Sequence, residues 1–284
     1  MIIAQITDTH VLPEGRKLGN LIDTNAQLEA AVRRLNRLTT PPEAVLVTGD
    51  LTDDGERDSY SALRARLAGL DCPFYLIPGN HDRRRALVEA FPEHAYLPQT
   101  GFLHYAIEDH AVRLVALDTL VEGREDGALC EERLAWLDAA LAAEPDRPAL
   151  IFMHHPPFES GIWWMDAMGL SGARRLGAVL EGHPQVRLVV CGHVHRAFHS
   201  VVGGVRVAVA PSTAWQVHLD LVPESPPHAA LEPAAGFLHL WNGDAFVTHT
   251  THLDPDAEPV ALAAMLGDWP QVLDRLRAQK AALD

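Results

Sequence analysis

The chain contains 284 residues, of which 48% are hydrophobic and 21% are charged, so a soluble globular protein with one large or two smaller domains is expected. Its formal net charge of −15 argues against a general affinity for nucleic acids or anionic membranes, because a large negative field repels both. The three cysteines, Cys72, Cys130 and Cys191, argue against a disulfide framework and favour a reducing compartment.

An apolar run follows Met1 at once, without a basic segment and a small-residue cleavage site, so the sequence predicts no signal peptide. No apolar run approaches the roughly 20 residues that are needed to span a bilayer. We therefore expect a cytoplasmic protein that binds neither a membrane nor nucleic acid.

Apolar runs of strand length recur along the chain. They cover residues 2–6, 44–47, 74–77, 102–107, 112–117, 149–153 and 186–191. Helical patterns lie between several of them, such as residues 26–38, where Leu28, Val32 and Leu35 share one stripe. Strands that alternate with helices predict an α/β fold with much parallel sheet. Three later runs, 205–210, 237–241 and 245–250, lack long helices between them, so we expect antiparallel strands in a second sheet packed on the first.

Two segments near the C-terminus break this pattern. Residues 211–233 are rich in proline and too long for an ordinary connection, which indicates an extended surface loop, a cap or an oligomer contact. Gly267 and Asp268 indicate a helix stop and a new N-cap, which predicts two short tail helices that cover the core or bind a partner. The chain thus divides into a core at 1–210, a cap or oligomerisation loop at 211–235, final core strands at 236–253 and a helical tail at 254–284.

Five short segments that each follow an apolar run carry most of the side chains suited to chemistry. They are Asp8 with His10, Asp50, Asn80 with His81 and Asp82, His154 with His155, and His193 with His195. Because ligands collect at the carboxyl ends of strands in α/β sheets, we expect the five segments to meet at one site. Imidazole and carboxylate together suit zinc, iron or manganese better than calcium or magnesium.

Local spacing supports this site. Asp8 and His10 lie two residues apart, so in an extended segment they face the same side, and the same holds for His193 and His195. Glycines precede Asp50, Asn80 and His193, where they allow a close approach of the backbone. The expected site therefore combines converging side chains with tight local packing.

The order of these motifs, DTH, GD, GNHD, HHPP and GHVH, resembles the calcineurin-like metallophosphoesterase family over roughly residues 1–253. Stretches such as FYLIPGNHD and ALIFMHHPP are most similar to the bacterial glycerophosphodiesterases and the class III cyclic nucleotide phosphodiesterases. The resemblance implies an αββα sandwich, in which two packed mixed β-sheets are flanked by helices. It also implies two divalent or trivalent metal ions, drawn from iron, manganese, zinc and cobalt, and a homo-oligomer.

Carried over residue by residue, the resemblance implies two ligand sets. Asp8, His10 and His195 would hold one metal together with Asp50, and Asn80, His154 and His193 would hold the second, with Asp50 as the bridge. In similar motifs the histidine two residues before the proline is the ligand, which favours His154 and leaves His155 as the alternative.

Asn80, His81 and Asp82 are the expected catalytic residues. Two adjacent metals can share a hydroxide and hold a phosphate for in-line attack. In related enzymes the position of His81 assists the phosphate or the leaving oxygen, so His81 is also expected to contact the substrate. Asp82 is expected to orient His81, as carboxylates behind a functional histidine often do.

Substrate contacts are less defined by the sequence. Trp163 and Trp164 are expected to form an apolar wall over a leaving group, with a subunit contact or a local core as the alternative. Residues 83–85 are three arginines, which either attract anions or form a solvated helix start. Trp215 stands where similar glycerophosphodiesterases have a histidine, and an indole cannot exchange a proton near neutral pH. Glycerophosphodiester specificity is therefore not implied, although His218 lies nearby.

The sequence thus predicts a dinuclear phosphoric diester hydrolase that acts on small molecules such as cyclic nucleotides, glycerophosphodiesters or aryl diesters. A phosphomonoesterase or a nuclease of the same fold is the alternative, and the acidic net charge disfavours the nuclease. A non-catalytic scaffold is a further alternative, which the seven filled ligand positions disfavour.

Overall fold

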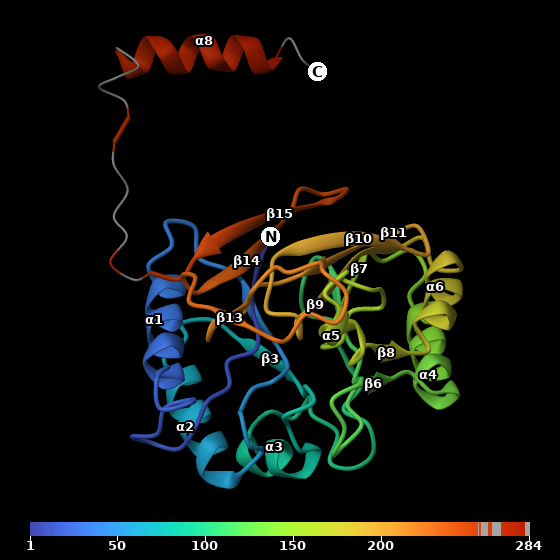
Figure 1. Ribbon diagram of the computed structural model, residues 1–284. Coiled ribbons are helices and arrows are strands. Elements are labelled where there is room, and N and C mark those ends of the chain that lie inside the picture. Colours follow the sequence, from blue (N-terminus) through green and yellow to red (C-terminus); the bar gives the residue numbers. More distant parts are fainter. Residues whose placement is uncertain (255, 257–260, 263–267, 282–284) are drawn as a thin grey trace.

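Two mixed β-sheets pack face to face, and helices cover their outer faces, as the computed structural model shows (Figure 1). The structure describes residues 1–254, 256, 261–262 and 268–281. One continuous apolar core, contributed by both sheets and the helices, fills the interior. The predicted α/β sandwich of two mixed sheets is confirmed.

The first sheet has the strand order β15-β14-β1-β2-β3. Its strands are β1 (Ile2–Ile6), β2 (Ala44–Thr48), β3 (Phe74–Ile77), β14 (Ala235–Trp241) and β15 (Phe246–His252). β1, β2 and β3 run parallel, whereas β14 is antiparallel to both β1 and β15. The last two strands are therefore antiparallel, as predicted, but they extend the first sheet rather than the second.

The second sheet has the order β10-β11-β9-β7-β5-β4. Its strands are β4 (Tyr105–Ile107), β5 (Arg113–Ala116), β7 (Ala149–Phe152), β9 (Val186–Cys191), β10 (Phe198–Val202) and β11 (Val205–Val209). β5, β7, β9 and β11 are parallel, and the edge strands β4 and β10 are antiparallel to their neighbours. We expected β11 to be antiparallel, and it is antiparallel to β10. Its other neighbour is β9, to which β11 runs parallel.

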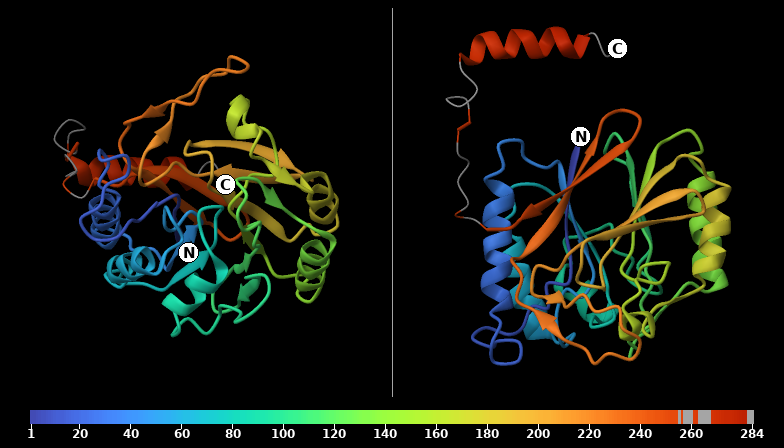
Figure 2. Two further views of the ribbon diagram at one scale, coloured as in Figure 1. Left: turned by 60° about the horizontal axis from the view of Figure 1, so that its bottom comes forward. Right: turned by 45° about the horizontal axis from the view of Figure 1, so that its top comes forward.

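Helices cover both outer faces of the sandwich, as the right view of Figure 2 shows. They are α1 (Thr24–Asn36), α2 (Arg57–Leu67), α3 (Arg84–Ala90), α4 (Glu131–Ala142) and α6 (Ala173–Glu181). The Asp23 side chain caps α1 by accepting a hydrogen bond from Ala26 N at 3.0 Å. Leu28, Val32 and Leu35 are buried along one side of α1, which confirms the predicted stripe.

Short strands tie the loops together near one edge of the sandwich. β6 (Gly127–Ala128) pairs in parallel with β8 (Leu170–Ser171), which follows the short helix α5 (Trp163–Asp166). β12 (Gln216–Val217) pairs antiparallel with β13 (Ala229–Ala230). The proline-rich segment is thus a surface hairpin, which projects from the body in the left view of Figure 2. Its role as a cap or an oligomer contact stays a prediction.

The C-terminal helix α8 (Trp269–Ala281) begins directly after Asp268, where the capping pattern predicted a helix start. The stop signal at Gly267, and the first of the two predicted tail helices, lie outside the described residues. Within the part of the chain that the structure describes, no helix combines the length and the apolarity that crossing a bilayer requires.

Candidate metal centre

The motif residues follow β1, β2, β3, β7 and β9, whose carboxyl ends meet at one edge of the sandwich. Contacts across the two sheets confirm that the edges coincide, because His195 Nε2 lies 3.2 Å from Asp8 Oδ1. The predicted convergence of the five segments is therefore observed.

Left-handed backbone conformations aim several of these side chains at the site. Non-glycine residues with positive φ at this edge are Asp8 (51°), His10 (42°), Asp50 (46°), His193 (73°) and His195 (52°). Asp8 and His10 do reach the same group of candidate ligands, as expected, but these segments are not extended, because a positive φ turns the chain at each paired residue. Such conformations cost on the order of 1 kcal/mol or more for a residue with a side chain, and they concentrate at functional sites.

Glycines provide the close approach that was predicted. A Cβ atom at Gly79 would overlap both the backbone nitrogen and the carboxylate of Asp50. A Cβ atom at Gly192 would overlap the Thr7 hydroxyl and lie 2.7 Å from Asp8 Oδ2. These two positions therefore allow the loops to pack directly on the acidic side chains.

The first group of candidate ligands contains Asp8, His10, Asp50 and His195, all of which are buried. Each offers one atom within 4.8 Å of the others. His10 Nε2 lies 3.1 Å from His195 Nε2 and 3.7 Å from Asp50 Oδ2. Four candidate ligand atoms thus surround one small volume.

The second group contains Asp50, Asn80, His154 and His193. His154 Nε2 lies 3.4 Å from Asp50 Oδ1 and 3.1 Å from Asn80 Oδ1. Asn80 Oδ1 also lies 3.1 Å from His193 Nδ1. Asp50 directs one carboxylate oxygen to each group, as a bridging ligand requires.

The outer ring nitrogen of each candidate histidine ligand faces an oxygen acceptor. The pairs are His10 with Asp53 Oδ1 (3.0 Å), His154 with Thr48 O (2.8 Å), His193 with Met168 O (3.0 Å) and His195 with Trp215 O (2.9 Å). Carbonyl and carboxylate oxygens only accept hydrogen bonds, so the outer nitrogens carry the protons. The inner nitrogens then direct lone pairs into the site, which is the tautomer that metal-binding histidines adopt.

This arrangement fits cations. The inner nitrogens of His10 and His195 face each other at 3.1 Å as two acceptors, and Asn80 Oδ1 faces two more acceptors. Buried acceptors and an ionised carboxylate at such distances repel one another unless positive charge lies between them.

His155 points away from the shared carboxylate. Its ring nitrogens lie 2.8 Å from Thr119 Oγ1 and 3.1 Å from the carbonyl oxygen of Glu125, and burial lowers its pKa to about 3. Although His155 lies within 4.8 Å of the His154 and His193 donors, both of its nitrogens have other partners. This geometry favours His154 as the ligand.

His81 lies beside the site and joins neither of the two groups that share Asp50, although it forms a further cluster of possible metal ligands with His10 and Asp53. Its backbone N–H donates to Asp50 Oδ1 at 2.9 Å, and its Nδ1 lies 2.7 Å from the carbonyl oxygen of Asp53. Burial lowers the pKa of His81, but the charges of Asp50 and Asp53 outweigh burial and raise it to about 9. A histidine held in this way can donate a hydrogen bond to a bound anion.

Asp82 has a different task from the one expected. Its carboxylate accepts hydrogen bonds from Gly79 N, Leu51 N and Tyr60 Oη at 2.8 Å, 3.0 Å and 2.8 Å. The His81 ring is instead held by Asp53. Asp82 therefore fastens the loop of Asp50 to the loop of Asn80, and the prediction that it orients His81 was wrong.

A cavity of about 80 Å³ opens beside the ligands. Its apolar lining residues include Trp164, Met165 and Trp215, and its polar lining residues include His81 and Glu125. Trp163 is 51% exposed and is not among the lining residues. Of the predicted aromatic contacts, the structure thus places Trp164 and Trp215 at the cavity and Trp163 outside it.

The three arginines at residues 83–85 form separate ion pairs. The pairs are Arg83 with Glu56 (2.9 Å), Arg84 with Asp118 (2.6 Å) and Arg85 with Glu89 (2.7 Å). Their charges are therefore balanced locally, and the helix-start alternative describes them better than a surface that attracts anions.

Sequence reasoning missed Asp53 and Glu125. Asp53 follows Asp50 by three residues in the same strand-end loop, so the strand-end rule could have included it. Glu125 belongs to a loop without a motif, and no pattern in the sequence marks it.

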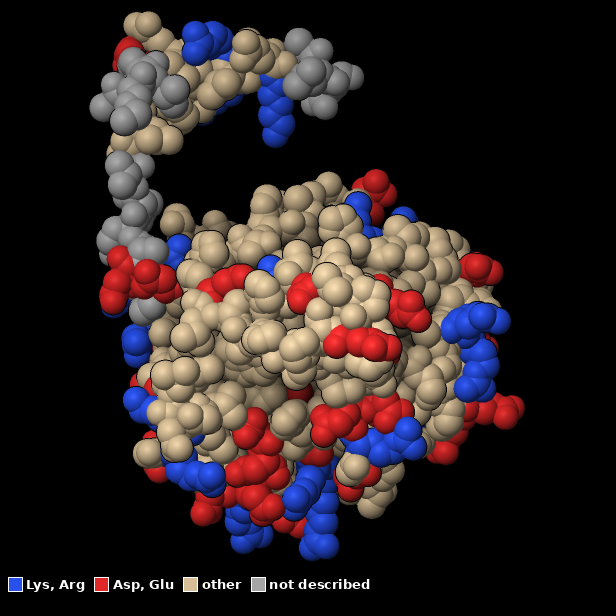
Figure 3. Space-filling model, viewed as in Figure 1, with Lys and Arg blue, Asp and Glu red and all other residues tan. Residues whose placement is uncertain are grey.

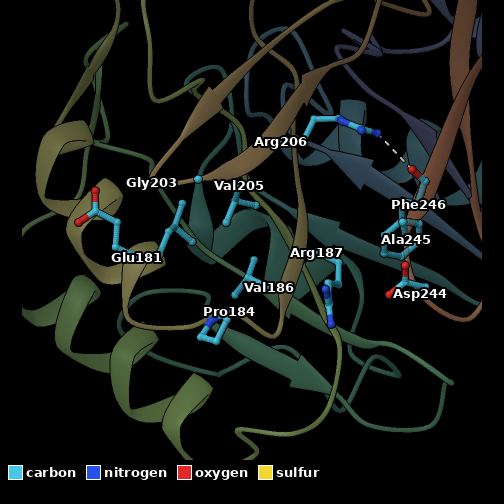
Figure 4. Close-up of a pocket in the computed structure, with 12 residues that line it drawn as sticks. Glu181, Pro184, Val186, Arg187, Gly203, Val205, Arg206, Asp244, Ala245 and Phe246 are labelled. Carbon is cyan, nitrogen blue, oxygen red and sulfur yellow. Dashed lines mark hydrogen bonds between the residues drawn. The ribbon is translucent and has the colours of Figure 1, made fainter.

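A larger cavity of about 470 Å³ lies at the opposite edge, where the β10–β11 and β14–β15 turns approach the start of β9 (Figure 4). Its charged side chains include Arg187, Arg206 and Asp244, and Arg206 donates to the carbonyl oxygen of Phe246 at 3.2 Å. Within the described ranges no cluster of candidate metal ligands lies there. The chemistry is thus concentrated at the smaller cavity.

Two packed mixed sheets with a candidate two-metal centre at their carboxyl edge define a class of metal-dependent hydrolases. The family model for calcineurin-like phosphoesterases matches residues 1–197, and the chain therefore belongs to the calcineurin-like phosphoesterase family.

Similar proteins extend the match over most of the chain. The glycerophosphodiester phosphodiesterase GpdQ of Enterobacter lignolyticus is 34% identical over 266 residues, which cover 91% of this chain and 94% of that protein. The 3',5'-cyclic adenosine monophosphate phosphodiesterase CpdA of Pseudomonas aeruginosa is 33% identical, with 76% of this chain and 77% of that protein covered. A dimetal phosphatase from Danio rerio has the same fold, with a TM-score of 0.63 at 17% identity over 89% of this chain and 96% of that one.

Proposed function

We propose that this protein is a dinuclear metal-dependent phosphodiesterase that hydrolyses small phosphodiesters. The observation that carries the proposal is the convergence of buried acceptors from five strand ends, arranged in two groups that share Asp50. The similarity to a glycerophosphodiesterase and to a cyclic nucleotide phosphodiesterase supports a diester as the substrate.

In the proposed assignment, Asp8, His10, Asp50 and His195 hold one metal, and Asp50, Asn80, His154 and His193 hold the other. When bound, the metals supply Lewis acidity and activate water for attack on phosphorus. Asp53 fixes the ring of His10, and the carbonyl oxygens of Thr48, Met168 and Trp215 fix the other three histidine ligands. The chain thus keeps the ligand orientations constant through catalysis.

His81 is proposed to bind the substrate phosphate or the leaving oxygen. Its Nδ1 is engaged by the carbonyl oxygen of Asp53, so Nε2 is left for a hydrogen bond in the cavity. Donors aimed at an oxygen that gains negative charge stabilise the transition state. Asn80 acts through its position as a ligand next to His81.

The apolar side of the cavity is proposed to receive the leaving group. Trp164, Met165 and Trp215 lie there, and the Trp215 ring is centred 4.2 Å from the ring of His195. Indole rings provide flat contact area, which suits a nucleoside or aryl ester better than glycerol. We therefore favour cyclic nucleotides and aryl diesters over glycerophosphodiesters.

Surface charge supports a small substrate. The face in Figure 3 shows acidic side chains gathered on its lower half and interspersed with basic ones, without a continuous basic stripe. Together with the net charge of −15, this disfavours the nuclease alternative, which needs a surface that neutralises phosphates.

The test compares bis(p-nitrophenyl) phosphate with p-nitrophenyl phosphate after chelation and reloading with manganese, iron, zinc or cobalt. We expect a preference for the diester and about two metals per chain. A strong preference for the monoester would establish the phosphomonoesterase alternative, and far fewer than two metals under replete conditions would favour a scaffold. A panel of cyclic nucleotides and glycerophosphodiesters then identifies the substrate class.

The homo-oligomer and the cytoplasmic location stay predictions, which sizing in solution and fractionation would address.

A further inference from the structure

We infer that Glu125 selects substrates by charge, so that the cavity accepts phosphate esters with one negative charge and disfavours those with two. This inference rests on the proposed phosphodiesterase function. It concerns a residue that no motif includes and that neither ligand group contains.

Glu125 lines the same cavity as His81 and the two tryptophans. Its Oε2 accepts a hydrogen bond from Asn80 Nδ2 at 3.1 Å, which fixes the Asn80 amide with Oδ1 facing the second ligand group. The Asn80 side-chain amide therefore lies between the Glu125 carboxylate and the proposed metal position. It also acts electrostatically on His81.

The loop that carries Glu125 is anchored at several points. The carbonyl oxygen of Glu125 lies 3.1 Å from Nε2 of the buried His155. Two residues later, the loop enters β6, which pairs with β8. Before Glu125, the carbonyl oxygen of Leu120 accepts hydrogen bonds from Arg84 and Arg133 at 2.6 Å and 2.9 Å. These contacts fix the backbone of the loop, and the hydrogen bond from Asn80 holds the exposed Glu125 carboxylate at the cavity.

His81 is the nearby group whose positive charge Glu125 favours, and no Lys or Arg side chain forms an ion pair with Glu125 in the described part of the chain. The neighbouring Arg124 binds Asp126 through two contacts of 2.7 Å and 2.9 Å. Among the residues that the structure describes, Glu125 has no ion pair with Lys, Arg or His. Its negative charge is therefore directed at whatever enters the cavity.

This charge has opposite consequences for substrate and product. A phosphodiester carries one negative charge, whereas a phosphomonoester at neutral pH carries close to two. Hydrolysis consumes one water, whose oxygen forms a new P–O bond while one ester P–O bond breaks to give an alcohol, and it releases a proton when the new monoester ionises. The monoester product is therefore repelled more strongly than the diester, and Glu125 both excludes monoester substrates and promotes product release.

The matched variants are E125Q and D126N. E125Q removes the charge and keeps an oxygen that accepts from Asn80, whereas D126N removes the same charge from the adjacent position, whose carboxylate faces Arg124. We expect E125Q to raise kcat/KM for p-nitrophenyl phosphate relative to bis(p-nitrophenyl) phosphate by about tenfold, which corresponds to one unit-charge repulsion at about 6 Å in a medium with a dielectric constant of about 40. D126N should leave this ratio unchanged. Inhibition by inorganic phosphate should become stronger in E125Q, with an unchanged metal content.

Two results would overturn the inference. An unchanged ratio in E125Q, with an E125A variant that loses activity toward both esters equally, would show that Glu125 merely positions Asn80. An equal shift in D126N would show a general effect of net charge.

In the wild-type protein, raising the salt concentration from about 0.01 M to about 0.5 M should also increase the monoester-to-diester ratio, because screening weakens an exposed charge. Wild-type protein that hydrolyses no diester would refute the proposed function itself, which is a separate outcome.

Discussion

At the carboxyl edge of the two sheets, left-handed backbone conformations are occupied by aspartate and histidine in addition to Gly49, whereas the turns at the opposite edge use glycine alone. Gly203, Gly204 and Gly243 have φ values of 55°, 77° and 105° in the turns that connect β10 to β11 and β14 to β15. Glycine adopts these values without a steric penalty. The carboxyl edge accepts the penalty because a glycine there could not carry a ligand, so backbone strain marks where side chains are required.

The two edges also differ in their cavities. The opposite edge has about 470 Å³ of open space but no group of candidate ligands in the described chain, and the carboxyl edge has about 80 Å³ next to two groups. In this molecule the grouping of candidate ligand atoms, rather than the volume of a cavity, indicates the candidate site. Four experiments would break or sharpen this contrast.

The largest effect is expected for D50A. Loss of the shared carboxylate removes a ligand from both metals, so activity should fall by on the order of a thousandfold or more, and the metal content should fall as well. Turnover assays and metal analysis measure the two losses. D244N, which removes a carboxylate at the opposite edge, should leave both unchanged. Retained turnover in D50A would refute the assignment of Asp50 as the bridge.

A smaller effect is expected for H81A. Its side chain belongs to neither ligand group, so the variant should keep its metals and lose about a hundredfold in kcat. Metal analysis beside steady-state kinetics separates the two properties. Loss of metal from H81A would instead make His81 a ligand and would enlarge the centre beyond seven residues.

Two glycine substitutions compare the edges directly. G79A should destabilise the protein by about 2 kcal/mol and reduce metal binding, because its Cβ would overlap Asp50. G243A meets no heavy atom within 4 Å but has φ of 105°, so it should lose about 1 kcal/mol with normal activity. Denaturant unfolding and activity assays test both. Equal activity in the two variants would mean that the packing at Gly79 is not needed for the site.

The smallest effect concerns a histidine outside the centre. His239 is buried in β14, with Nε2 3.1 Å from Gln5 Oε1 and Nδ1 2.9 Å from Thr248 Oγ1, and burial lowers its pKa to about 3. Below about pH 6.5 the unfolded chain binds a proton that the folded chain excludes, so stability falls with falling pH by about 1.4 kcal/mol per pH unit until about pH 3. Unfolding of H239Q between pH 7 and pH 5 should show a slope that is shallower by about 1 kcal/mol per pH unit on average, because the unfolded histidine is only partly protonated at the upper end of this range. Identical slopes would mean that the group does not stay neutral in the folded protein.

Much of the centre could be predicted because short motifs after apolar runs determine where ligands lie. The order of Asp8, Asp50, Asn80 and His193 along the chain was enough to place them at one edge. The left-handed conformations of Asp8, Asp50 and His193 could not be predicted, since few non-glycine residues adopt a positive φ and tertiary contacts decide where it occurs. Glu125 was missed for a related reason, because a buried histidine thirty residues away sets its position.

The topology shows the same limit. Periodicity identified the strands of the core but not the partners of β11, β14 and β15, because pairing depends on which edges are open when the chain returns. The prediction that Asp82 orients His81 failed because a carboxylate next to a histidine can instead accept hydrogen bonds from nearby backbone N–H groups.

The contact between His195 and residue 215 has a consequence for how such enzymes diverge. Nδ1 of His195 lies 2.9 Å from the main-chain carbonyl oxygen of Trp215, while the indole itself faces the cavity. Every amino acid carries that carbonyl group. A mutation at this codon would therefore exchange the side chain that faces the cavity and leave the support of the candidate ligand His195 in place, so under the proposed assignment the substrate could change while the metal centre is kept.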